Sequence, residues 1–484
     1  MIDKPDALFD RDAEWGELSS FATDDRLGAT LALVYGRRRQ GKTLLLELLA
    51  ESVDGMMITG LEQSSLMNLA AIGETYAQHR GLGAPVTFAS WSDALDALLA
   101  VGEGDSPALI VIDEFPYLLR SAPELPSVLQ RALSPRGRAR QRSRTRIVLC
   151  GSAFSVMRGL LAGSAALRGR ATREVVVHPF DYRQARQFWA IEDVELAARV
   201  HALVGGTPAY LDYADGQPPA DAQSFDEWVV RHVLNPSSAF FREGRLLVGE
   251  EPTLADSGLY FSVLAALSTG RTRRSEIAAA LGRTENALAH PLSVLQDTRL
   301  VEARVDALRS RRTTYHIAEP MLRFHQLITT PHEARLVRRH GMQVWTTVQP
   351  TVSSAIYGPH FEELCREWAR EHAAPPAVGG SAESAQVSAL ACPTHRKQHE
   401  IDVVVRANGR VSAIGEAKWR QRPIGIDQLD RLRHIRTILP PVQAPEPPRL
   451  LLFSRNGFEP ELRHEARAAK DVELIDLSRL YHGD

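Results

Sequence analysis

The sequence contains little cysteine and little lysine. Its three cysteines, Cys150, Cys365 and Cys392, are scattered through 484 residues without a C-x-x-C pair. This usage favours a reducing compartment and predicts no zinc site. Only five of the 57 basic residues are lysines. A lysine therefore draws attention wherever a compact ammonium serves better than a planar guanidinium.

The sequence also lacks a membrane segment and a strong net charge. No apolar run approaches the ~18 residues that suggest a membrane span, and the N-terminus, MIDKPDALFDRD, has no signal-peptide core. The formal net charge is −2, so any contact with nucleic acid must come from local basic patches. We therefore expect a soluble, cytoplasmic protein with no membrane partner.

A phosphate-binding pattern follows the first apolar run of the chain. Residues 31–35 have the length and composition of a strand, and residues 36–43, GRRRQGKT, fit G-x-x-x-x-G-K-[ST]. Residues 44–50 are strong helix formers. Because strand, loop and helix follow in the order that this motif requires, the pattern predicts an ATP site.

The loop residues have separate expected roles. Gly36 and Gly41 let the backbone wrap around a polyphosphate. The backbone amides at the N-terminus of the helix that follows the loop would then point at the phosphate charge. Lys42 can reach the β- and γ-phosphates, and the Thr43 hydroxyl can ligate Mg²⁺. ATP and Mg²⁺ are therefore the expected cofactors of this part of the chain.

A second acidic motif completes the predicted site. Residues 108–113, ALIVID, form a continuous apolar run, as a central parallel strand does. Asp113 at its end would hold Mg²⁺ through water, and Glu114 would orient and deprotonate the attacking water. Ser152, after a further strand at residues 147–150, could touch the γ-phosphate, although Gly-Ser is also common turn chemistry.

Arginines outside the loop offer two further hypotheses. Arg168 or Arg170 could stabilise transition-state charge, in the same chain or from a neighbouring subunit of a homo-oligomer, or could simply lie at the surface. Six more occupy alternate positions in PRGRARQRSRTR. They are Arg136, Arg138, Arg140, Arg142, Arg144 and Arg146. Such a row could track a DNA backbone, and it is also typical of a solvated loop.

The pattern changes at residue 257. An apolar helical stripe, a short helix at 274–281 and a third helix at 284–297 precede two strands around DALRSRR. This order is typical of a winged helix-turn-helix, with DALRSRR as the wing.

The ligand of this segment stays open at the level of sequence. Winged helices bind DNA or another protein, and the wing arginines Arg309, Arg311 and Arg312 favour DNA. Pro291, inside the third helix, predicts a kink in the element that would face the DNA.

The C-terminal part contains a hairpin with acidic residues. Residues 401–405 and 411–417 have strand character and are joined at Asn408–Gly409, a strong turn signal. Asp402 lies on the first strand, and Glu416 and Lys418, one residue apart on the second, share a face. Two carboxylates and a lysine can bind Mg²⁺ or Mn²⁺ and activate water against a phosphodiester. The spacing resembles the PD-(D/E)xK nuclease core, and the alternative is a charged surface hairpin.

The assembled segments resemble the archaeal-type ATPases of the AAA/STAND class. Those segments include VYGRRRQGKT, LIVIDEFPYLL, IVLCGSAFSVM, VGGTPAYL, FEELCREWA, EIDVVV and GEAKWR. The resemblance implies an α/β chain with a parallel-sheet P-loop domain, a helical lid, a winged helix and a restriction-endonuclease-like domain. It also implies that Gly206 and Pro208 rest near the nucleotide base, and that Glu362 joins Asp402, Glu416 and Lys418 at a metal.

These observations predict five segments and two competing functions. The segments are an ATPase core at 1–190, a lid at 191–250, a winged helix at 251–330, a linker at 331–357 and a nuclease-like domain at 358–484. The first function is an ATPase that controls a metal-dependent DNA nuclease. The second is a nucleotide-dependent switch that binds DNA or a protein partner without cutting.

Overall fold

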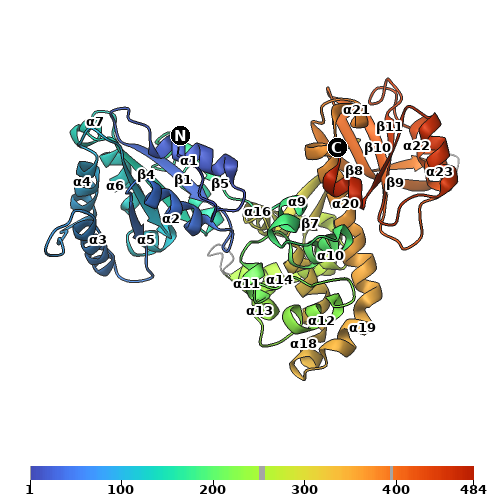
Figure 1. Ribbon diagram of the computed structural model, residues 1–484, viewed down its shortest axis with the longest axis horizontal. Helices are drawn as coiled ribbons and strands as arrows, with labels where there is room; N and C mark the ends of the chain where they lie inside the picture. The colour runs from blue at the N-terminus through green and yellow to red at the C-terminus, as the bar shows by residue number, and fades with distance from the viewer. Residues whose placement is uncertain (1, 250–256, 393–395) are drawn as a thin grey trace. The chain divides into compact units, whose positions relative to one another are not determined.

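The computed structural model of the chain describes residues 2–249, 257–392 and 396–484. The described residues form two compact units, one ending at residue 179 and the other beginning at residue 180 (Figure 1). The boundary predicted between lid and winged helix, at residues 250 and 251, lies at the edge of a segment outside the described residues.

The first unit contains a five-stranded sheet whose paired strands are all parallel. The strand order is β2-β3-β4-β1-β5. The strands are β1 (Thr30–Tyr35), β2 (Met56–Thr59), β3 (Ala108–Asp113), β4 (Thr145–Gly151) and β5 (Ala171–Val176). Because β4 lies between β1 and β3, the residues that follow these three strands gather at one edge of the sheet.

Helices cover both faces of this sheet. They are α1 (Asp12–Ala22), α2 (Lys42–Ser52), α3 (Ser65–His79), α4 (Trp91–Val101), α5 (Phe115–Ser121), α6 (Leu125–Ala132), α7 (Arg138–Arg142) and α8 (Phe154–Gly159). Side chains alternate along β1, as a pleated strand requires. Leu31 and Leu33 face one core, with α3 and α4, while Ala32 and Val34 face the other, with α1 and α2.

The second unit begins with a group of helices. They are α9 (Tyr182–Phe188), α10 (Val194–Val204), α11 (Tyr210–Tyr213), α12 (Phe225–Trp228) and α13 (Ala239–Gly249). Gly205 ends α10 with a φ of 72°. A Cβ on Gly206 would lie 1.8 Å from the Phe180 carbonyl oxygen, so packing alone requires glycine at this position.

Three helices and a hairpin follow in the predicted order. They are α14 (Ser257–Ser268), α15 (Arg274–Ala280), α16 (Ala289–Asp297), β6 (Val301–Asp306) and β7 (Arg309–Ile317). The predicted kink at Pro291 is wrong, because a separate short turn at Glu285–Leu288 precedes α16. Pro291 therefore lies in the first turn of α16, where a missing amide hydrogen costs nothing.

The segment predicted as a linker is helical. Residues 320–367 contain α17 (Pro320–Phe324), α18 (Thr330–Val337), α19 (Gly341–Thr351) and α20 (Gly358–Glu367). Val344, Trp345 and Val348 of α19 are buried in the same core as helices α10 and α12. The segment is thus packed into the unit along one face.

The C-terminal part is a mixed sheet with order β12-β11-β10-β9-β8. The strands are β8 (Ser384–Cys392), β9 (Lys397–Ala407), β10 (Arg410–Lys418), β11 (Arg449–Ser454) and β12 (Val472–Asp476). The hairpin between β9 and β10 turns at Asn408 and Gly409, whose φ values of 50° and 71° are both positive. This confirms the predicted turn, since type I′ geometry requires positive φ at both residues.

Helices cover the two faces of this second sheet as well. Besides α20, they are α21 (Pro375–Val378), α22 (Ile426–Thr437), α23 (Pro460–Ala468) and α24 (Leu477–His482). Phe361 and Leu364 of α20 share a core with Val403, whereas Leu429 and Leu432 of α22 share the other core. Within the part of the chain that the structure describes, no helix is long and apolar enough to cross a membrane.

Candidate functional site

The predicted phosphate loop connects β1 to α2. Gly41 precedes the helix with a φ of 82°, and Arg39 also has a positive φ, of 67°. A Cβ on Gly36 would lie 2.2 Å from the Val177 carbonyl oxygen. Only glycine fits at Gly36 without moving the backbone, and glycine adopts the Gly41 conformation at least cost. The two glycines of the motif thus each have a steric or conformational reason.

Lys42 is held at the centre of this loop. Its Nζ donates a hydrogen bond to the Arg37 carbonyl oxygen at 2.8 Å. Lys42 is buried, with only 6% of its surface exposed. Burial lowers the pKa of the Lys42 ammonium, against the opposing charges of Glu114 and Asp113. A buried ammonium held by one loop carbonyl is suited to an anion, since phosphate oxygens would offer it a stronger partner.

The second motif contacts the first directly. The Thr43 hydroxyl donates to Asp113 Oδ2 at 2.8 Å, and the Glu114 amide donates to Asp113 Oδ1 at 2.8 Å. Asp113 is 3% exposed. A hydroxyl and a carboxylate in contact are the oxygen ligands that Mg²⁺ prefers. The residues present therefore fit a magnesium ion beside a nucleotide phosphate.

Ser152 lies between the two motifs, at the end of β4. Its hydroxyl is 3.2 Å from each carboxylate oxygen of Glu114. Arg38 Nε lies 3.2 Å from the same hydroxyl, and Arg38 Nη2 donates to the Tyr117 hydroxyl at 2.7 Å. Arg38 and Tyr117 were missed by the sequence analysis. Arg38 occupies a variable position of the motif, so spacing alone carried no signal.

Arg11 supports the loop from the N-terminal segment. Its Nη2 donates to the Gln40 carbonyl oxygen at 3.2 Å, and its Nη1 pairs with Glu14 at 3.2 Å. Burial lowers the pKa of this guanidinium, although Glu14 acts in the opposite direction. Arg11 therefore helps to fix the backbone of the phosphate loop, and no sequence motif marks it.

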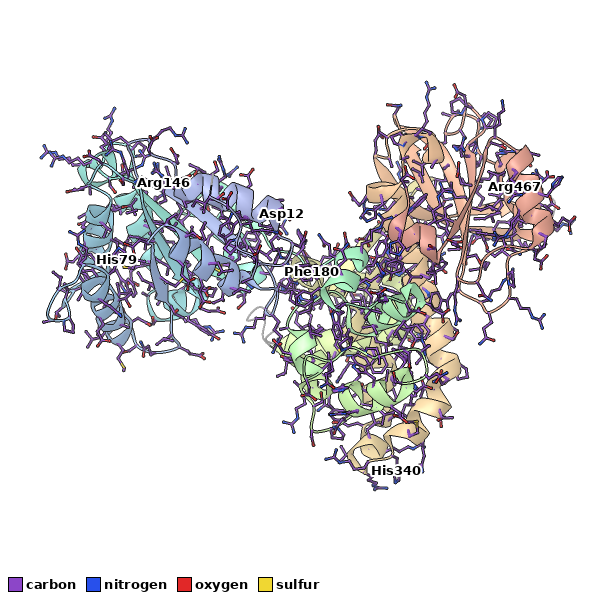
Figure 2. The ribbon with its side chains drawn as sticks, viewed as in Figure 1. Asp12, His79, Arg146, Phe180, His340 and Arg467 are labelled. Carbon is purple, nitrogen blue, oxygen red and sulfur yellow. The ribbon has the colours of Figure 1, made fainter. Side chains whose placement is uncertain are left out.

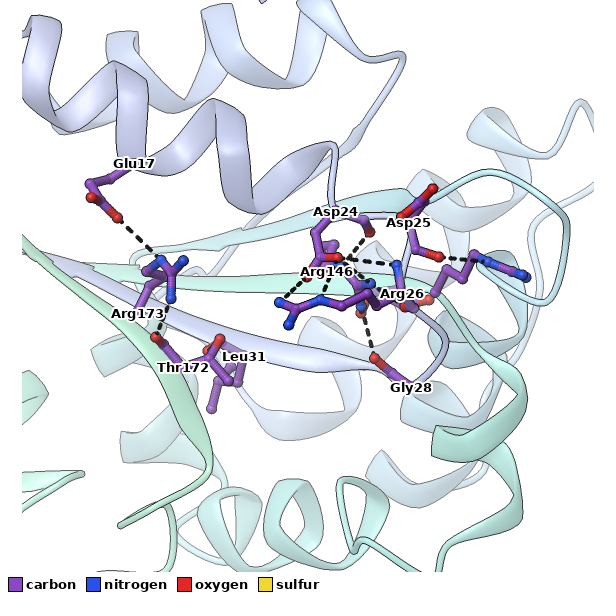
Figure 3. A network of polar contacts seen from close by, with 11 residues as sticks. Glu17, Asp24, Asp25, Arg26, Gly28, Leu31, Arg146, Thr172 and Arg173 are labelled. Atoms are coloured by element: carbon purple, nitrogen blue, oxygen red, sulfur yellow. Dashed lines mark hydrogen bonds and ion pairs between the residues drawn. The ribbon is translucent and has the colours of Figure 1, made fainter. Parts of the chain in front are cut away.

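Three of the six alternating arginines are structural. Arg146 is fully buried and donates to the carbonyl oxygens of Asp24 (2.9 Å), Gly28 (2.8 Å) and Arg26 (Figures 2 and 3). Arg140 and Arg144 also bind backbone carbonyls. The hypothesis that all six track a DNA backbone is therefore wrong for Arg146, whose guanidinium is buried among backbone carbonyls, and it stays a prediction for the other five.

Two predicted groups have contacts with residues outside the phosphate loop. Arg168 is exposed and donates to the Gly163 carbonyl oxygen of its own loop at 2.6 Å. Gly206 packs on the Phe180 backbone, and the Phe180 amide donates to its carbonyl at 2.8 Å. The roles of Arg168 and Arg170 at a transition state, and of Gly206 and Pro208 near the base, stay predictions.

A second cluster lies in the C-terminal sheet. Lys418 Nζ pairs with Glu416 and lies 3.7 Å from Asp402 Oδ2. The same Asp402 oxygen accepts a hydrogen bond from the Ala417 amide at 2.9 Å. Glu416 is 2% exposed. The residues predicted from the hairpin are thus brought together, with Asp402 tied to the adjacent strand.

Two arginines that the sequence analysis missed border this cluster. Arg431 of α22 pairs with Glu416 and donates to the Glu400 carbonyl oxygen at 2.8 Å. Arg366 of α20 donates to the Asp402 carbonyl oxygen at 3.0 Å. Neither arginine belongs to the hairpin whose spacing carried the motif, so residue spacing gave no signal for them.

Neighbouring glutamates on α20 have opposite electrostatic environments. Burial, and then the charge of Asp402, raise the pKa of Glu362 to about 7. Burial acts in the same direction on Glu363, but Arg304, Arg323 and Arg366 outweigh it and lower its pKa to about 2. Glu362 therefore belongs electrostatically to the acidic cluster, whereas Glu363 is the counter-ion of buried arginines.

These environments predict opposite effects of two adjacent substitutions. The raised Glu362 pKa means that stability falls as pH rises from the ordinary value of 4.5 through about 7. Glu362→Gln should therefore raise the thermal midpoint of metal-free protein near pH 8 and change it little near pH 4. The depressed Glu363 pKa contributes stability above pH 4.5 that is lost only towards about pH 2. Glu363→Gln should lower the midpoint near pH 8. Thermal melts in chelator test both, and shifts of the same sign would contradict the assignment.

The wing hairpin is attached to the C-terminal sheet by its tip. The Ala307 amide donates to the Val387 carbonyl oxygen at 3.1 Å, and Ser388 Oγ donates to Asp306 at 2.6 Å. The Leu308 carbonyl oxygen accepts from Gln443 at 3.0 Å. The predicted wing, DALRSRR, is therefore not a free loop throughout. Asp306 and Leu308 at its tip are buried, and β7 begins at Arg309.

The wing arginines line a basic pocket instead. Arg309, Arg311 and Arg312 surround an open space of about 450 Å³ together with Arg273 and Arg274. Glu285 is the acidic residue among the lining side chains. The excess of guanidinium groups fits an anion such as a phosphate.

Comparisons with known proteins support an ATPase in the N-terminal part of the chain. Residues 8–214 match the family model described as an ATPase domain predominantly from Archaea. The chain therefore carries an archaeal-type ATPase domain. A Walker-type ATPase of Pyrococcus abyssi is similar in structure, with 21% identity, a TM-score of 0.52, and coverage of 67% of this chain and 97% of the other. This likeness shows a P-loop ATPase fold.

Two further similarities are weaker. An uncharacterized protein of Methanocaldococcus jannaschii is 23% identical over 300 residues, which are 60% of this chain. The match spans 62% of that relative's own length. The ORC2 protein of Aeropyrum pernix has 16% identity and a TM-score of 0.44, with coverage of 71% of this chain and 96% of the other. That score is too low to carry an argument.

Proposed function

We propose that this protein hydrolyses ATP in its N-terminal domain and uses its C-terminal part to bind DNA and cleave it with a divalent metal. The observation that carries the cleavage is the cluster of three carboxylates and one lysine from α20, β9 and β10. Lys418 lies within 3.7 Å of Asp402 and pairs with Glu416. Glu362 is coupled to Asp402 by charge.

In the proposed ATP site, each side chain has a separate role in hydrolysis. Lys42 would leave the Arg37 carbonyl and bind the β- and γ-phosphates. Thr43 and Asp113 would hold Mg²⁺, which neutralises phosphate charge when bound. Glu114 would accept a proton from the attacking water while the bond between the β- and γ-phosphates breaks. The contact of Ser152 with both Glu114 oxygens supports a positioning role for that hydroxyl.

Three further elements complete the proposed ATPase cycle. Gly206 and Pro208 of the lid would lie near the base. Arg168 or Arg170 would add positive charge at the γ-phosphate, from this chain or from a second copy in a homo-oligomer. The role of the lid residues rests on the resemblance of VGGTPAYL to the corresponding segment of archaeal-type ATPases, and the role of the arginines on the negative charge that develops at the transition state.

In the second site, the proposed ligands of Mg²⁺ or Mn²⁺ are Asp402 and Glu416, with Glu362 completing or orienting the shell. Carboxylate oxygens suit both ions. The metal supplies Lewis acidity and a more acidic bound water. Lys418 would hold the attacking water or steady charge on the phosphate. Burial, and then the charge of Asp402, raise the pKa of Glu416. This supports a site whose carboxylates a bound cation would stabilise.

DNA binding is proposed for the basic pocket of the winged-helix segment. Arg309, Arg311 and Arg312 line it with Arg273 and Arg274. Because the wing tip is attached to the C-terminal sheet, DNA held at this pocket would approach the domain that carries the acidic cluster. This geometry favours contacts of the arginines with phosphates over insertion of the wing tip into a groove.

The pocket makes a prediction about salt dependence. Changing Arg309, Arg311 and Arg312 to serine should flatten the slope of log affinity against log salt by roughly 2–3 units, because each phosphate contact contributes about 0.9. Fluorescence anisotropy with duplex DNA measures the slope. The matched control changes three exposed arginines of the first unit that lie outside the alternating row, Arg80, Arg120 and Arg131, and we expect it to leave the slope nearly unchanged. Equal effects of the two variants would contradict the assignment.

A regulatory switch is the second candidate, and one observation favours it. Arg431 pairs with Glu416 and is anchored to the Glu400 carbonyl oxygen. A guanidinium in this position competes with a metal for the same carboxylate. If Arg431 never leaves, the domain would bind DNA or a protein partner without cutting.

Titration with Mn²⁺ in the absence of nucleotide tests the proposed metal site. Wild-type protein should bind the ion, and Asp402→Asn should weaken binding strongly because one charged ligand is lost. Asp427→Asn, at an exposed carboxylate on α22, is the matched control and should bind as wild type does. Equal Mn²⁺ affinity in all three proteins would count against cleavage and for the switch.

A further inference from the structure

The C-terminal sheet and the helix that covers it bring together the side chains of one cysteine and two histidines. Cys392 ends β8, His399 lies near the start of β9, and His434 lies in the last turns of α22. Their ligand atoms, one from each residue, all lie within 4.8 Å of one another. The Cys392 Sγ is 3.2 Å from His434 Nε2.

The strand register explains why two of these residues meet. Leu390 pairs with His399, and Cys392 pairs with Lys397. Directly opposed residues share a face of an antiparallel pair, and so do residues two apart along one strand. Cys392 and His399 therefore occupy diagonal positions on one face of the sheet, with Leu390 beside them in the core under α22.

The third residue comes from the helix that covers this face. His434 follows Leu432 and precedes Ile435, which are both buried in the same core. Its ring lies 5.6 Å from that of His399, at an angle of 68°. The fold thus directs an imidazole from α22 towards the thiol and imidazole of the sheet.

From this arrangement we infer a site for zinc at Cys392, His399 and His434. A thiolate and two imidazoles are a set that Zn²⁺ binds with tetrahedral geometry. Zinc–sulfur and zinc–nitrogen bonds of about 2.3 and 2.0–2.1 Å place the sulfur and nitrogen about 3.6 Å apart in a tetrahedron. The Cys392–His434 separation of 3.2 Å needs only a small adjustment to reach it.

The site is distinct from the acidic cluster in chemistry. Glu362, Asp402 and Glu416 offer oxygen, which suits Mg²⁺ and Mn²⁺, whereas sulfur and nitrogen select softer ions. Binding would join the end of the β8–β9 pair to α22 and leave one tetrahedral position for water or another group. Since Arg431 precedes His434 by one helical turn, the ion would also fix the helix that presents Arg431 to Glu416.

Cobalt substitution tests the inference on the full chain. We expect Co²⁺ to give a thiolate-to-metal charge-transfer band and intense visible bands of tetrahedral cobalt, and one equivalent of Zn²⁺ to remove both. Cys392→Ser and His434→Ala should each lose the charge-transfer band. His464→Ala, at an exposed histidine on the neighbouring α23, is the matched control and should keep it. The thiolate band separates this site from oxygen sites that also take up cobalt.

A second measurement uses wild-type protein alone, so a misfolded variant cannot affect its result. Zinc should slow alkylation of Cys392 in wild-type protein, as followed by mass spectrometry of the peptide that contains it. Absence of the cobalt thiolate band in wild-type protein would overturn the inference. So would a band that persists in folded Cys392→Ser, or alkylation of Cys392 that zinc does not slow. Such results would leave a thiol–imidazole hydrogen bond as the whole explanation of the cluster.

Discussion

Lys42→Ala should abolish detectable ATP binding and reduce ATP hydrolysis by ~100–1,000-fold or more, the cost of losing one preorganised donor at a reacting group. The expected loss is large because Lys42 is a buried ammonium held by the Arg37 carbonyl within the loop. Isothermal titration with ATP measures binding, and phosphate release measures hydrolysis.

Two matched variants make this result specific. Lys470→Ala removes an exposed lysine of the second unit and should leave both measurements unchanged. Glu114→Gln keeps the size of the side chain but removes the base, so it should bind ATP and hydrolyse it slowly. Wild-type ATP affinity in Lys42→Ala would contradict the assignment of the phosphate loop.

Asp402→Ala should reduce DNA cleavage to background while leaving ATP hydrolysis measured without DNA unchanged. Changing a residue that only orients a metal ligand reduces metal affinity or activity about 10–100-fold. Loss of a direct ligand should therefore reduce cleavage at least ~100-fold. Lys418→Ala should have an effect of similar size, because the ammonium lies beside both Asp402 and Glu416. ATP hydrolysis should not change, since both residues belong to the second unit.

The controls for cleavage come from α22. Asp427→Ala removes an exposed carboxylate and should cleave DNA at the wild-type rate. Arg431→Ala removes the cation that pairs with Glu416, so it should lower the metal concentration needed for half-maximal cleavage. Cleavage that survives in Asp402→Ala would show that the activity comes from elsewhere.

The ATP site was predictable because its signal is local. Strand, loop and helix follow one another directly, from Thr30 to Ser52, in the order that the phosphate-loop pattern requires. Asp113 and Ser152 were predictable because parallel strands bring their carboxyl ends to one edge. Arg11 and Arg38 were not, since their partners are single backbone or hydroxyl oxygens that impose no sequence pattern.

The C-terminal sheet was only partly predictable. The β9–β10 hairpin carried its own turn signal at Asn408–Gly409 and its own acidic residues. By contrast, β8, SAQVSALAC, is rich in small residues and carries no strand signal of its own. It is a strand because β9 supplies its hydrogen-bond partners, so its structure depends on tertiary pairing rather than on β-propensity.

Charge patterns were the least reliable guide. Alternating arginines suggested one surface, yet Arg146 is buried among the carbonyls of Asp24, Arg26 and Gly28 (Figure 3). The row does not lie on one element: residues 138–142 form α7, whereas Arg146 lies in β4, a central strand of the sheet, where its side chain is fully buried. The scattered cysteines predicted no zinc site, and that prediction stays untested; sequence spacing could not show that Cys392 lies beside His399 of β9 and His434 of α22.

Nicking of supercoiled plasmid tests the central claim most directly. Wild-type protein and Asp402→Ala are incubated with the plasmid and Mn²⁺, with and without ATP, and released phosphate is measured in the same reactions. We expect wild-type protein to convert supercoiled DNA to open circles, Asp402→Ala to leave it intact, and both to consume ATP at the same rate. DNA that stays supercoiled with wild-type protein under every metal and nucleotide condition, while ATP is consumed, would contradict the nuclease and support the switch.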